Sequence, residues 1–578
     1  MLTKTKALLI GLLAAACVPY SGADIILHSG LILSMDRFQP PAQALAIVDG
    51  KILAVGSNAE IMPLGNWSTR KVNLKGATVL PGLTDSHFHL AGFGRHLETL
   101  NLFGTQSAEQ VARRVARQAA LTSPGTWITG RGWDQNDWAV KKFPDRSLLD
   151  EVAPNHPVAL TRVDGHAIWA NSAALGLAGI DANSRDPEGG RIIQRDNGEP
   201  TGVLIDNAKS PLTAAIPKPS VADIRRRLEK AITRLNQVGL TSIHDPGVNQ
   251  TTLDILMQMA DEGVLNIRYY AMLNGDEPAL LRRHFEQGPT IEYNQRVTIR
   301  SVKLYGDGAL GSRGAALLSQ YSDDPGNLGL TLTSASELER AVDASIAAGF
   351  QPAIHAIGDR AVRTALNIYE KMLDKYADRD IRPRIEHAQI ITRRDIRRFG
   401  KLGVIASMQP THATSDMYWA EDRLGSQRIK GAYAWKSLLE AGVTIAGGSD
   451  CPVEREEPLL QFFAARTRQD TTGWPESGWY SSQKMTGLAA ARSMTAWAAI
   501  AAFSDSIRGR ILPGFDADLT ILSRNPLSDP PEVILDTKVL TTILGGQTVW
   551  RDDKAWKKMP LPPFVKQSDD SATEAGSR

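Results

Sequence analysis

Two histidines, His87 and His89, close an apolar run, TVLPGLTDSHFHL, that is typical of a buried strand. In an extended strand, residues i and i+2 point to the same side, so both imidazoles can reach one point beyond the end of the strand. Imidazole nitrogens are common zinc ligands, and the pair therefore predicts half of a metal site. A single pair of this kind is more often used for packing or capping, so the prediction requires further ligands.

Four further side chains of suitable chemistry occur downstream, each near the end of a short β-branched run: Lys303, His355, His387 and Asp450. Taken singly, each has an ordinary structural explanation, as a hydrogen-bonded core histidine, a helix N-cap or a lysine that reaches solvent. Chance does not readily place all of them at the ends of successive strands. The set therefore favours one shared centre.

Eight apolar runs, separated mostly by segments of helix length, must position these residues. They are LTDSHFHL, GLTSIHD, NIRYYAML, RVTIRSVKLYGD, GFQPAIHA, RPRIEHA, GVIASMQ and VTIAGGSD. The alternation predicts an α/β fold, a parallel (β/α)8 TIM-like barrel over residues 81–507, in preference to a doubly wound sheet. Barrel enzymes place their chemistry at the carboxyl ends of the strands, where the six candidate residues fall.

The segment from about residue 95 to 220 lies between the first two runs and is too long for one crossover helix. It is rich in Trp, Gly and Asp, as in GRGWDQNDW and RVDGHAIWANSAAL. We expect an inserted subdomain beside the barrel mouth. Its candidate substrate contacts are Trp133, Asp134 and His166, although an aromatic segment of this kind is often the core of a subdomain.

The two ends of the chain share a texture of short apolar runs separated by turn residues. This texture covers residues 24–80, returns over residues 508–555, and predicts several antiparallel strands. Because the two stretches are alike and distant in sequence, we expect one small β-sandwich domain built from both. Residues 556–578 are polar and predict a disordered tail.

The first 23 residues have the composition of a secretory signal peptide. Lys4 and Lys6 precede the apolar run ALLIGLLAAA, and small residues precede Asp24. The run is too short for an ordinary transmembrane helix, and no later stretch reaches the roughly 20 apolar residues that a span requires. We therefore expect an exported protein, periplasmic or secreted, with lipid anchoring through Cys17 as the alternative.

The charge and cysteine content narrow the class of protein. The 578 residues include 65 Lys and Arg against 63 Asp and Glu, a formal net charge of +2. Such an even balance of charges does not favour a nucleic-acid-binding surface, and we expect a small-molecule substrate. Cys17 and Cys451 are the only cysteines, which excludes a disulfide scaffold. The sequence is compatible with a homo-oligomer and does not specify one.

Six segments of the chain resemble blocks of the amidohydrolase superfamily, and within it amidohydrolase family 3, the branch that includes N-substituted formamide deformylases. These segments are LPGLTDSHFHL, VKLYGDGALGSR, IHAIGDRAV, RIEHAQ, GSDCPVE and GFDADLTIL. The resemblance covers nearly the whole mature chain. It implies a metal-dependent barrel with a small β-sandwich made from both chain ends, which agrees with the expectation drawn from the apolar runs.

Neutral imidazoles and carboxylates suit Zn²⁺, with other divalent metals as the alternative. The candidate donors divide into two groups, one for a first ion and one for a second: His87, His89 and Asp450, then His355 and His387. An ammonium has no lone pair, so Lys303 could bridge two ions only as a carbamate formed with CO2. The resemblance implies this N6-carboxylation. With an unmodified lysine, a mononuclear site is the alternative.

A centre of this kind activates water for attack on a carbonyl carbon. Asp450 would act as general base toward the water and then as general acid toward the leaving nitrogen. The prediction is a metal-dependent hydrolase of C–N bonds, acting on an amide, N-acyl or N-formyl group. The alternatives are a lactone, ester or phosphoester hydrolase or a deaminase with the same site, and a catalytically inactive binding or regulatory protein.

Overall fold

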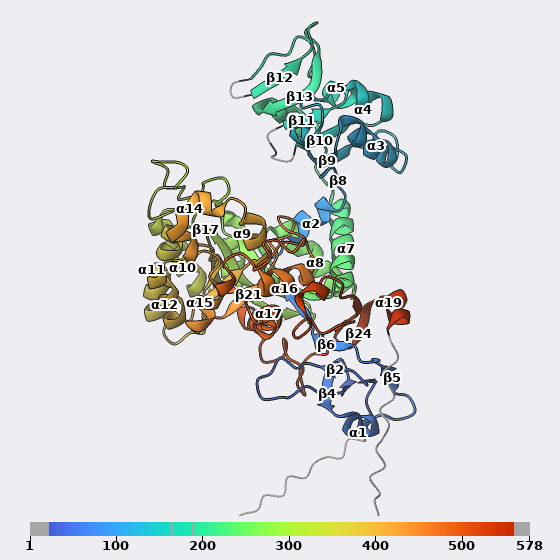
Figure 1. Ribbon diagram of the computed structural model, residues 1–578, viewed down its shortest axis with the longest axis vertical. Helices are drawn as coiled ribbons and strands as arrows, with labels where there is room; N and C mark the ends of the chain where they lie inside the picture. The colour runs from blue at the N-terminus through green and yellow to red at the C-terminus, as the bar shows by residue number, and fades with distance from the viewer. Residues whose placement is uncertain (1–21, 163–164, 166, 188–189, 560–578) are drawn as a thin grey trace, which may run out of the picture.

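The computed structural model describes residues 22–162, 165, 167–187 and 190–559. Three parts follow one another along its longest axis (Figure 1). A sheet formed within residues 100–206 lies at one end, the barrel lies in the middle, and two sheets that include strands from both chain ends lie at the other. Cys17 and residues 1–21 of the predicted signal peptide lie outside the described residues.

Eight parallel strands form the barrel, which confirms the predicted TIM-like fold. Their hydrogen-bonded order is β21-β20-β19-β18-β17-β15-β14-β7, so neighbours in the barrel are also successive in the chain. A short strand, β16 (Thr290–Tyr293), pairs with β17 in the antiparallel sense. The barrel strands are β7 (Leu83–Asp85), β14 (Leu240–Val248), β15 (Arg268–Asn274), β17 (Val297–Tyr305), β18 (Gln351–Ala356), β19 (Arg384–His387), β20 (Ile405–Met408) and β21 (Ile445–Gly447).

The first and last barrel strands meet through the residues at their ends. The backbone N–H of Ser86 donates to the carbonyl of Gly447 (2.9 Å), and the N–H of Asp450 donates to the carbonyl of His87 (2.7 Å). Phe88 and Cys451 form an isolated parallel bridge just beyond. These bonds nearly close the barrel and align the segments after β7 and β21.

The helices around the barrel carry their start signals in the sequence. Ser220 and Ser334 are N-caps, and Asp223 and Glu337 complete capping boxes with them. The apolar faces of the helices pack on the strands in one continuous core. The principal helices are α2 (Leu90–His96), α7 (Val221–Gln237), α8 (Gln250–Asp261), α9 (Pro278–Gln287), α10 (Ala335–Ala347), α11 (Asp359–Lys375), α12 (Arg393–Leu402), α13 (Pro410–Asp416), α14 (Ala420–Arg428), α15 (Trp435–Glu440), α16 (Pro458–Thr467), α17 (Gly487–Ser493) and α18 (Ala496–Ala501).

Strands from both chain ends form two sheets that share an apolar core, which includes Leu27, Ile47, Leu519 and Ile543. Five strand pairs in these sheets are antiparallel, as predicted, whereas β1 with β5 and β2 with β6 run parallel. The strands are β1 (Ile25–His28), β3 (Ala44–Val48), β4 (Lys51–Gly56) and β5 (Arg70–Asn73) in one sheet, and β2 (Leu31–Ile32), β6 (Thr78–Pro81), β22 (Leu519–Leu522), β23 (Val539–Leu544) and β24 (Gln547–Arg551) in the other, with α1 (Asn58–Ile61) beside them.

The start of the predicted C-terminal tail requires a correction. Helix α19 spans Asp553–Lys558, across the predicted boundary at residue 556. Trp556 is buried against the core of the two sheets, and its indole N–H donates to Thr541 Oγ1 (2.9 Å). The polar composition of the segment concealed this one anchoring aromatic residue. Residues 560–578 of the predicted tail lie outside the described part of the chain.

Between α2 and α7 the chain forms a separate six-stranded sheet, which we call the insertion. Its core contains three tryptophans, Trp133, Trp138 and Trp169. In Figure 1 the insertion projects from the barrel beside the start of α7. Its elements are β8 (Leu100–Asn101), β9 (Ile128–Trp133), β10 (Val158–Arg162), β11 (Ala167–Ala170), β12 (Gly190–Gln194), β13 (Pro200–Asp206), α3 (Ala108–Ala119), α4 (Ser147–Val152), α5 (Ser172–Leu177) and α6 (Ser210–Ala215).

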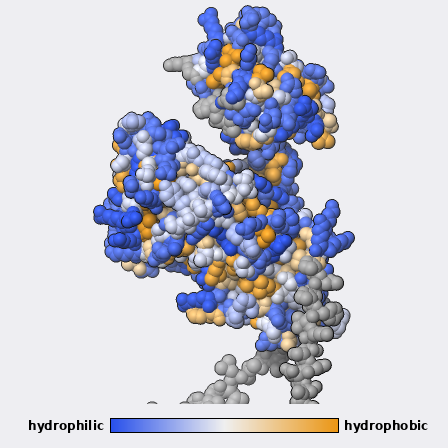
Figure 2. All heavy atoms as spheres, viewed as in Figure 1, coloured by the Kyte–Doolittle hydropathy of each residue, from blue (hydrophilic) through white to orange (hydrophobic). Residues whose placement is uncertain are grey.

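Two features of the outer surface concern what the protein can contact. Hydrophilic residues predominate over the outer helices of the barrel, at the left of Figure 2. Among the described residues, no helix combines the length and the apolar character that a bilayer crossing demands.

Candidate metal centre

Three of the predicted ligands meet at the carboxyl end of the barrel. The candidate ligand atoms of His87, His387 and Asp450 all lie within 4.8 Å of one another, and all three side chains are buried. His87 and Asp450 follow β7 and β21, whereas His387 is the last residue of β19. Since β19 and β7 are far apart in the order of strands, curvature of the sheet into a barrel is what brings this triad together.

The other predicted ligands adjoin the triad. His89 Nε2 lies 3.0 Å from Asp450 Oδ1, and Lys303 Nζ lies 3.5 Å from His87 Nε2. The ring centroid of His355 lies 4.4 Å from that of the second triad histidine. The structure therefore places all six predicted side chains, from the ends of β7, β17, β18, β19 and β21, in one cluster.

The two histidines of the HxH pair lie in the turn after β7, because that strand ends at Asp85. Alternation along a strand is therefore not the reason that both face Asp450. Their backbone is instead held from β21: the carbonyl of His87 accepts from Asp450 N (2.7 Å), and the N–H of His89 donates to Cys451 O (2.9 Å). Bonds between the segments that follow β7 and β21 thus hold the backbone from which both rings extend.

Two members of the triad have left-handed backbone conformations. His387 has φ 72° and Asp450 has φ 58°, which is uncommon for residues other than glycine. Such conformations cost about 1–3 kcal/mol each and persist where the surroundings fix them. At His387 the departure from strand geometry occurs at the end of β19, where the ring comes within 4.9 Å of the His87 ring, centroid to centroid.

Burial keeps three of the imidazoles neutral at physiological pH. Burial, reinforced by the charge of Lys303, lowers the pKa of His87 to about 4. The same two causes lower the pKa of His355 to about 3, and burial lowers the pKa of His387 well below its usual value. Neutral imidazoles retain a nitrogen lone pair, which a metal requires.

Asp450 provides the negative charge of the centre. Burial alone would raise its pKa, but the surrounding histidines hold the pKa of this carboxyl well below its usual range. His89 responds in the opposite sense: burial lowers its pKa, and the hydrogen bond and charge of Asp450 outweigh that effect and raise it. Because its pKa lies well below the usual range, Asp450 is ionised at neutral pH. Burial also lowers the pKa of Lys303, to about 8.

The donor set fits a divalent metal. His355 Nε2 is buried and has no hydrogen-bond partner among the described residues. Buried polar nitrogens are rarely left in that condition, and a neutral imidazole can use such an atom to bind a cation. Four imidazoles and a carboxylate around a lysine are nitrogen and oxygen donors of the kind that zinc accepts.

Comparison with known proteins agrees with this geometry. Residues 70–550 match the profile described as "Amidohydrolase family". The chain belongs to the amidohydrolase family. It is 32% identical to the putative amidohydrolase YtcJ of Bacillus subtilis, over 91% of this chain and 99% of that one, and 26% identical to the N-substituted formamide deformylase of Arthrobacter pascens, over 90% and 97%. The crystal structure of an uncharacterized metal-dependent hydrolase from Pyrococcus horikoshii superposes with a TM-score of 0.72 and 29% identity, covering 88% of this chain and 99% of that one.

Two buried aspartates near the centre of this amidohydrolase, Asp85 and Asp307, accept hydrogen bonds from backbone. Asp85 does not bond a histidine ring; its carboxylate accepts from the backbone N–H groups of His87 and Ser449. Asp307 accepts from the backbone N–H groups of Ala316, Ile357 and Gly358, so it joins the loop after β17 to the loop after β18. Both carboxylates therefore hold backbone, and Asp307 Oδ1 also lies 3.7 Å from His355 Nε2.

Three residues around the amidohydrolase centre were not identified from sequence. Glu386 Oε2 lies 2.6 Å from His87 Nδ1, and Gln409 Oε1 lies 3.1 Å from His387 Nδ1. His412, on α13, places Nε2 3.7 Å from Asp450 Oδ2. The sequence offered weak signals only: Glu386 precedes a candidate ligand, Gln409 closes the seventh apolar run, and His412 follows it in MQPTH.

The candidate substrate residues of the insertion do not join this cluster. Trp133 is fully buried in the core of the insertion, where its indole N–H donates to the Leu160 carbonyl (2.7 Å). Asp134 Oδ1 accepts from the Arg162 guanidinium (2.8 Å). His166 lies outside the described residues. In the structure, the two described side chains thus serve contacts within the insertion.

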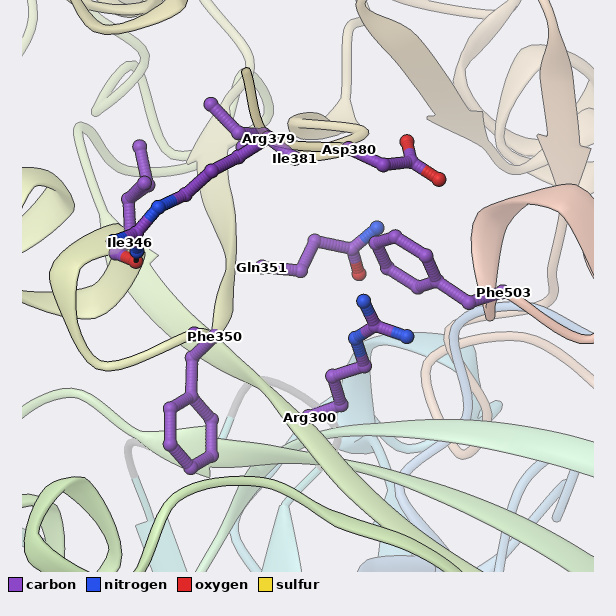
Figure 3. A pocket seen from close by; sticks show the side chains of 9 residues that line it. Arg300, Ile346, Phe350, Gln351, Arg379, Asp380, Ile381 and Phe503 are labelled. Carbon is purple, nitrogen blue, oxygen red and sulfur yellow. Dashed lines mark hydrogen bonds between the residues drawn. The ribbon is translucent and has the colours of Figure 1, made fainter. Parts of the chain in front are cut away.

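A recess elsewhere on the barrel is not part of the amidohydrolase centre. It has a volume of about 240 Å³, and its walls include Arg300, Phe350, Gln351 and Phe503 (Figure 3). Arg300 precedes Lys303 on β17 and Gln351 begins β18, so the recess opens at the amino ends of these strands. The candidate ligands lie at the opposite ends.

Proposed function

We propose that this protein hydrolyses the C–N bond of a small amide, an N-acyl or N-formyl compound, in a metal-dependent reaction. The convergence of His87, His387 and Asp450 at the carboxyl end of the barrel carries the proposal. The family assignment supports hydrolysis, and the relative named N-substituted formamide deformylase supports the choice of a C–N bond. The reaction converts an amide and water into a carboxylate and an amine.

The residues that would hold metal are those of the cluster: His87, His89 and Asp450 for one ion, His355 and His387 for a second, and Lys303 between them. A bound divalent ion, zinc by the chemistry of these donors, would polarise the substrate carbonyl and lower the pKa of water. Burial maintains the neutral state of His87, His355 and His387 that metal binding requires.

Asp450 is suited to move the proton. It is ionised at neutral pH, because the neighbouring histidines hold its pKa well below the usual range. Its Oδ1 lies 3.0 Å from His89 Nε2, and its Oδ2 lies 3.7 Å from His412 Nε2. We infer that Asp450 accepts a proton from the attacking water and then delivers it to the leaving nitrogen.

Lys303 can take part only in a modified form. Burial lowers the pKa of its amine to about 8, so a sizeable neutral fraction is present near that pH. A neutral amine reacts with CO2 to give a carbamate and a proton, and the carbamate supplies two oxygen donors. We propose that Lys303 is N6-carboxylated in the active protein, and the mass of the intact metal-loaded chain tests this through an added CO2.

A product screen tests the proposed reaction. Purified protein loaded with zinc is incubated with N-formyl and N-acyl amines, lactones, phosphotriesters and amino-substituted heterocycles, and the products are identified by mass spectrometry. The expected result is release of an amine together with a carboxylate. Exclusive turnover of lactones or phosphotriesters, or release of ammonia from a heterocycle, would move the assignment to another bond. Absence of turnover for every class in the metal-loaded protein would favour a binding role.

The metal count has a separate test. Anomalous difference maps recorded above and below the zinc absorption edge count the ions directly. We expect two peaks, one beside His87 and Asp450 and one beside His355 and His387. A single peak would support the mononuclear alternative with an unmodified lysine.

We also propose that the protein is exported, on the evidence of its N-terminal segment. The charged residues, the apolar run and the small residues before Asp24 have the order that a signal peptide requires. Fractionation of the producing cells followed by N-terminal sequencing tests this. A mature chain that begins at Asp24 outside the cytoplasm is expected, whereas a lipid-modified Cys17 at the N-terminus would indicate anchoring.

A further inference from the structure

Glu386 lies beneath the cluster of candidate ligands, on the side of His87 that faces away from the other five. It is fully buried, and its Oε2 lies 2.6 Å from His87 Nδ1. The other ring nitrogen, Nε2, lies 3.5 Å from Lys303 Nζ and 3.6 Å from Asp450 Oδ1. One edge of the His87 ring therefore faces a carboxylate, and the opposite edge faces the cluster.

The chemistry of this contact fixes which nitrogen carries the proton. An ionised carboxylate only accepts hydrogen bonds, so His87 Nδ1 must donate. In a neutral imidazole the second nitrogen then bears the lone pair, and at His87 that atom is Nε2. The contact therefore presets the tautomer in which His87 can bind a metal on the side of the cluster.

Arg384 keeps Glu386 ionised and in place. Both residues lie on β19 and are two positions apart, so both side chains enter the barrel interior. Arg384 is fully buried, and its Nε donates to Glu386 Oε1 (2.7 Å) while its Nη2 donates to Oε2 (3.2 Å). Such a bidentate pair leaves a carboxylate little freedom to turn.

The Arg384 guanidinium also contacts groups on or beside other strands. Its Nη2 donates to the Ser86 carbonyl (2.8 Å) and to Ser407 Oγ (3.0 Å), and its Nη1 lies 3.0 Å from His244 Nδ1. These partners lie on or next to β7, β20 and β14. The Arg384 guanidinium thus ties Glu386 to residues on or beside three other strands, which restricts movement of the carboxylate.

We propose that Glu386, anchored by Arg384, is a positioning residue that holds His87 in the tautomer and orientation needed for metal binding. This inference rests on the proposed metal-dependent function, but it concerns the preparation of the site before metal arrives. Loss of a carboxylate behind a metal-binding histidine typically costs 10–100-fold in metal affinity. We expect an effect of that size here.

Neutron diffraction from metal-free crystals at neutral pH tests the tautomer in the wild-type protein. Deuterium on His87 Nδ1, with none on Nε2, is expected. Deuterium on Nε2 alone, or on both nitrogens, would overturn the proposal. This test needs no variant and no substrate.

Zinc affinity, measured by competition with a chromophoric chelator, tests the consequence. Glu386→Gln should weaken binding about 10–100-fold. Glu386→Asp keeps the charge that Arg384 requires but withdraws the carboxylate by one methylene, so it should fold and also bind zinc more weakly. Glu370→Gln is the matched control, because Glu370 pairs with Arg398 on the barrel exterior, and its zinc affinity should stay within about twofold of wild type.

The metal-free unfolding midpoint separates positioning from structural damage. For Glu386→Asp it should stay near the wild-type value while zinc affinity falls. Wild-type zinc affinity in both Glu386 variants would overturn the proposal even if C–N hydrolysis is confirmed. Conversely, a wild-type protein that binds zinc tightly but cleaves no amide would overturn the proposed function and leave the role of Glu386 intact.

Discussion

The two ends of the barrel both bury charged and polar side chains, but they use them in opposite ways. At the amino end, Arg268 at the start of β15 forms a bidentate pair with Asp518, with both nitrogen–oxygen distances at 2.9 Å. Gly545 N also donates to Asp518 (2.7 Å), and Arg508 donates to Asp516 (2.8 Å) and to Glu292 (2.7 Å). Each charge in this group has an opposite charge and good hydrogen bonds.

At the carboxyl end the pairing is incomplete. His355 Nε2 and His412 Nδ1 are buried without hydrogen-bond partners among the described residues. Burial lowers the pKa of His355 to about 3, so its ring does not gain a charge that would need a partner. His387 and Asp450 also adopt left-handed backbone conformations. At the amino end, the polar groups join the barrel to the sheets of the chain ends. At the carboxyl end, donor atoms remain that can bind a ligand.

The largest expected effect concerns the carboxyl end. Asp450→Asn should lower kcat/KM for the best amide by about 10³-fold or more, because it removes both a general base and a charged ligand. The unfolding midpoint should change by only a few degrees. Steady-state kinetics and thermal unfolding measure the two quantities. Asp196→Asn, an exposed change in the insertion, is the control and should alter neither; near-normal turnover in Asp450→Asn would contradict the proposed mechanism.

The amino end should respond in the opposite manner. Asp518→Ala removes the bidentate partner of the buried Arg268 charge, which keeps only the longer contact with Asp516 (3.4 Å), and should destabilise the fold by about 3 kcal/mol. Zinc affinity per folded molecule should stay close to wild type. Urea unfolding and zinc competition check these outcomes. Asp518→Asn, which can still accept from Gly545, should lose less stability; an equal loss of zinc affinity would show that the two ends are coupled.

Removing the metal should lower both activity and stability, and both effects should arise at the carboxyl end of the barrel. Chelation should abolish turnover, and added zinc should restore it. Because a ligand that binds only the folded state stabilises it, zinc at about 100 times its dissociation constant should add about 2.7 kcal/mol. Calorimetry with and without zinc measures this shift. The shift should become smaller in His387→Ala and persist in Asp518→Asn, and an unchanged shift in His387→Ala would exclude His387 as a ligand.

The smallest expected effect is a pH dependence at the amino end. Burial alone would raise the pKa of Asp518, but the Arg268 and Arg508 guanidiniums hold it below its usual range. An aspartate in the unfolded chain titrates near 3.9. The stability that Asp518 contributes is therefore fully present above about pH 4 and is lost as the pH falls through the lower folded pKa. As the pH falls from 6 to 3, the free energy of unfolding measured in urea should decrease more for the metal-free wild-type protein than for metal-free Asp518→Asn. Parallel losses would contradict this assignment.

The patterns of single segments were sufficient for the barrel. Eight apolar runs separated by helix-length segments predicted the eight strands, because the hydrophobic period is a local property of the chain. The capping residue Ser220 likewise marks the start of α7 in the sequence. The local pattern gave a wrong prediction where a single side chain decides the structure. Trp556 anchors a helix in a segment whose composition is polar and predicted disorder.

The sequence by itself determined the fold class and the residue types gathered at the strand ends, since both follow from local patterns and from spacing. Only the tertiary structure decided how those residues act. It placed Glu386 behind His87, turned His387 toward the other rings through a left-handed backbone, and held the HxH pair through β21 instead of through strand alternation. These contacts join residues up to several hundred positions apart, and the closure of the barrel alone fixes which of them meet.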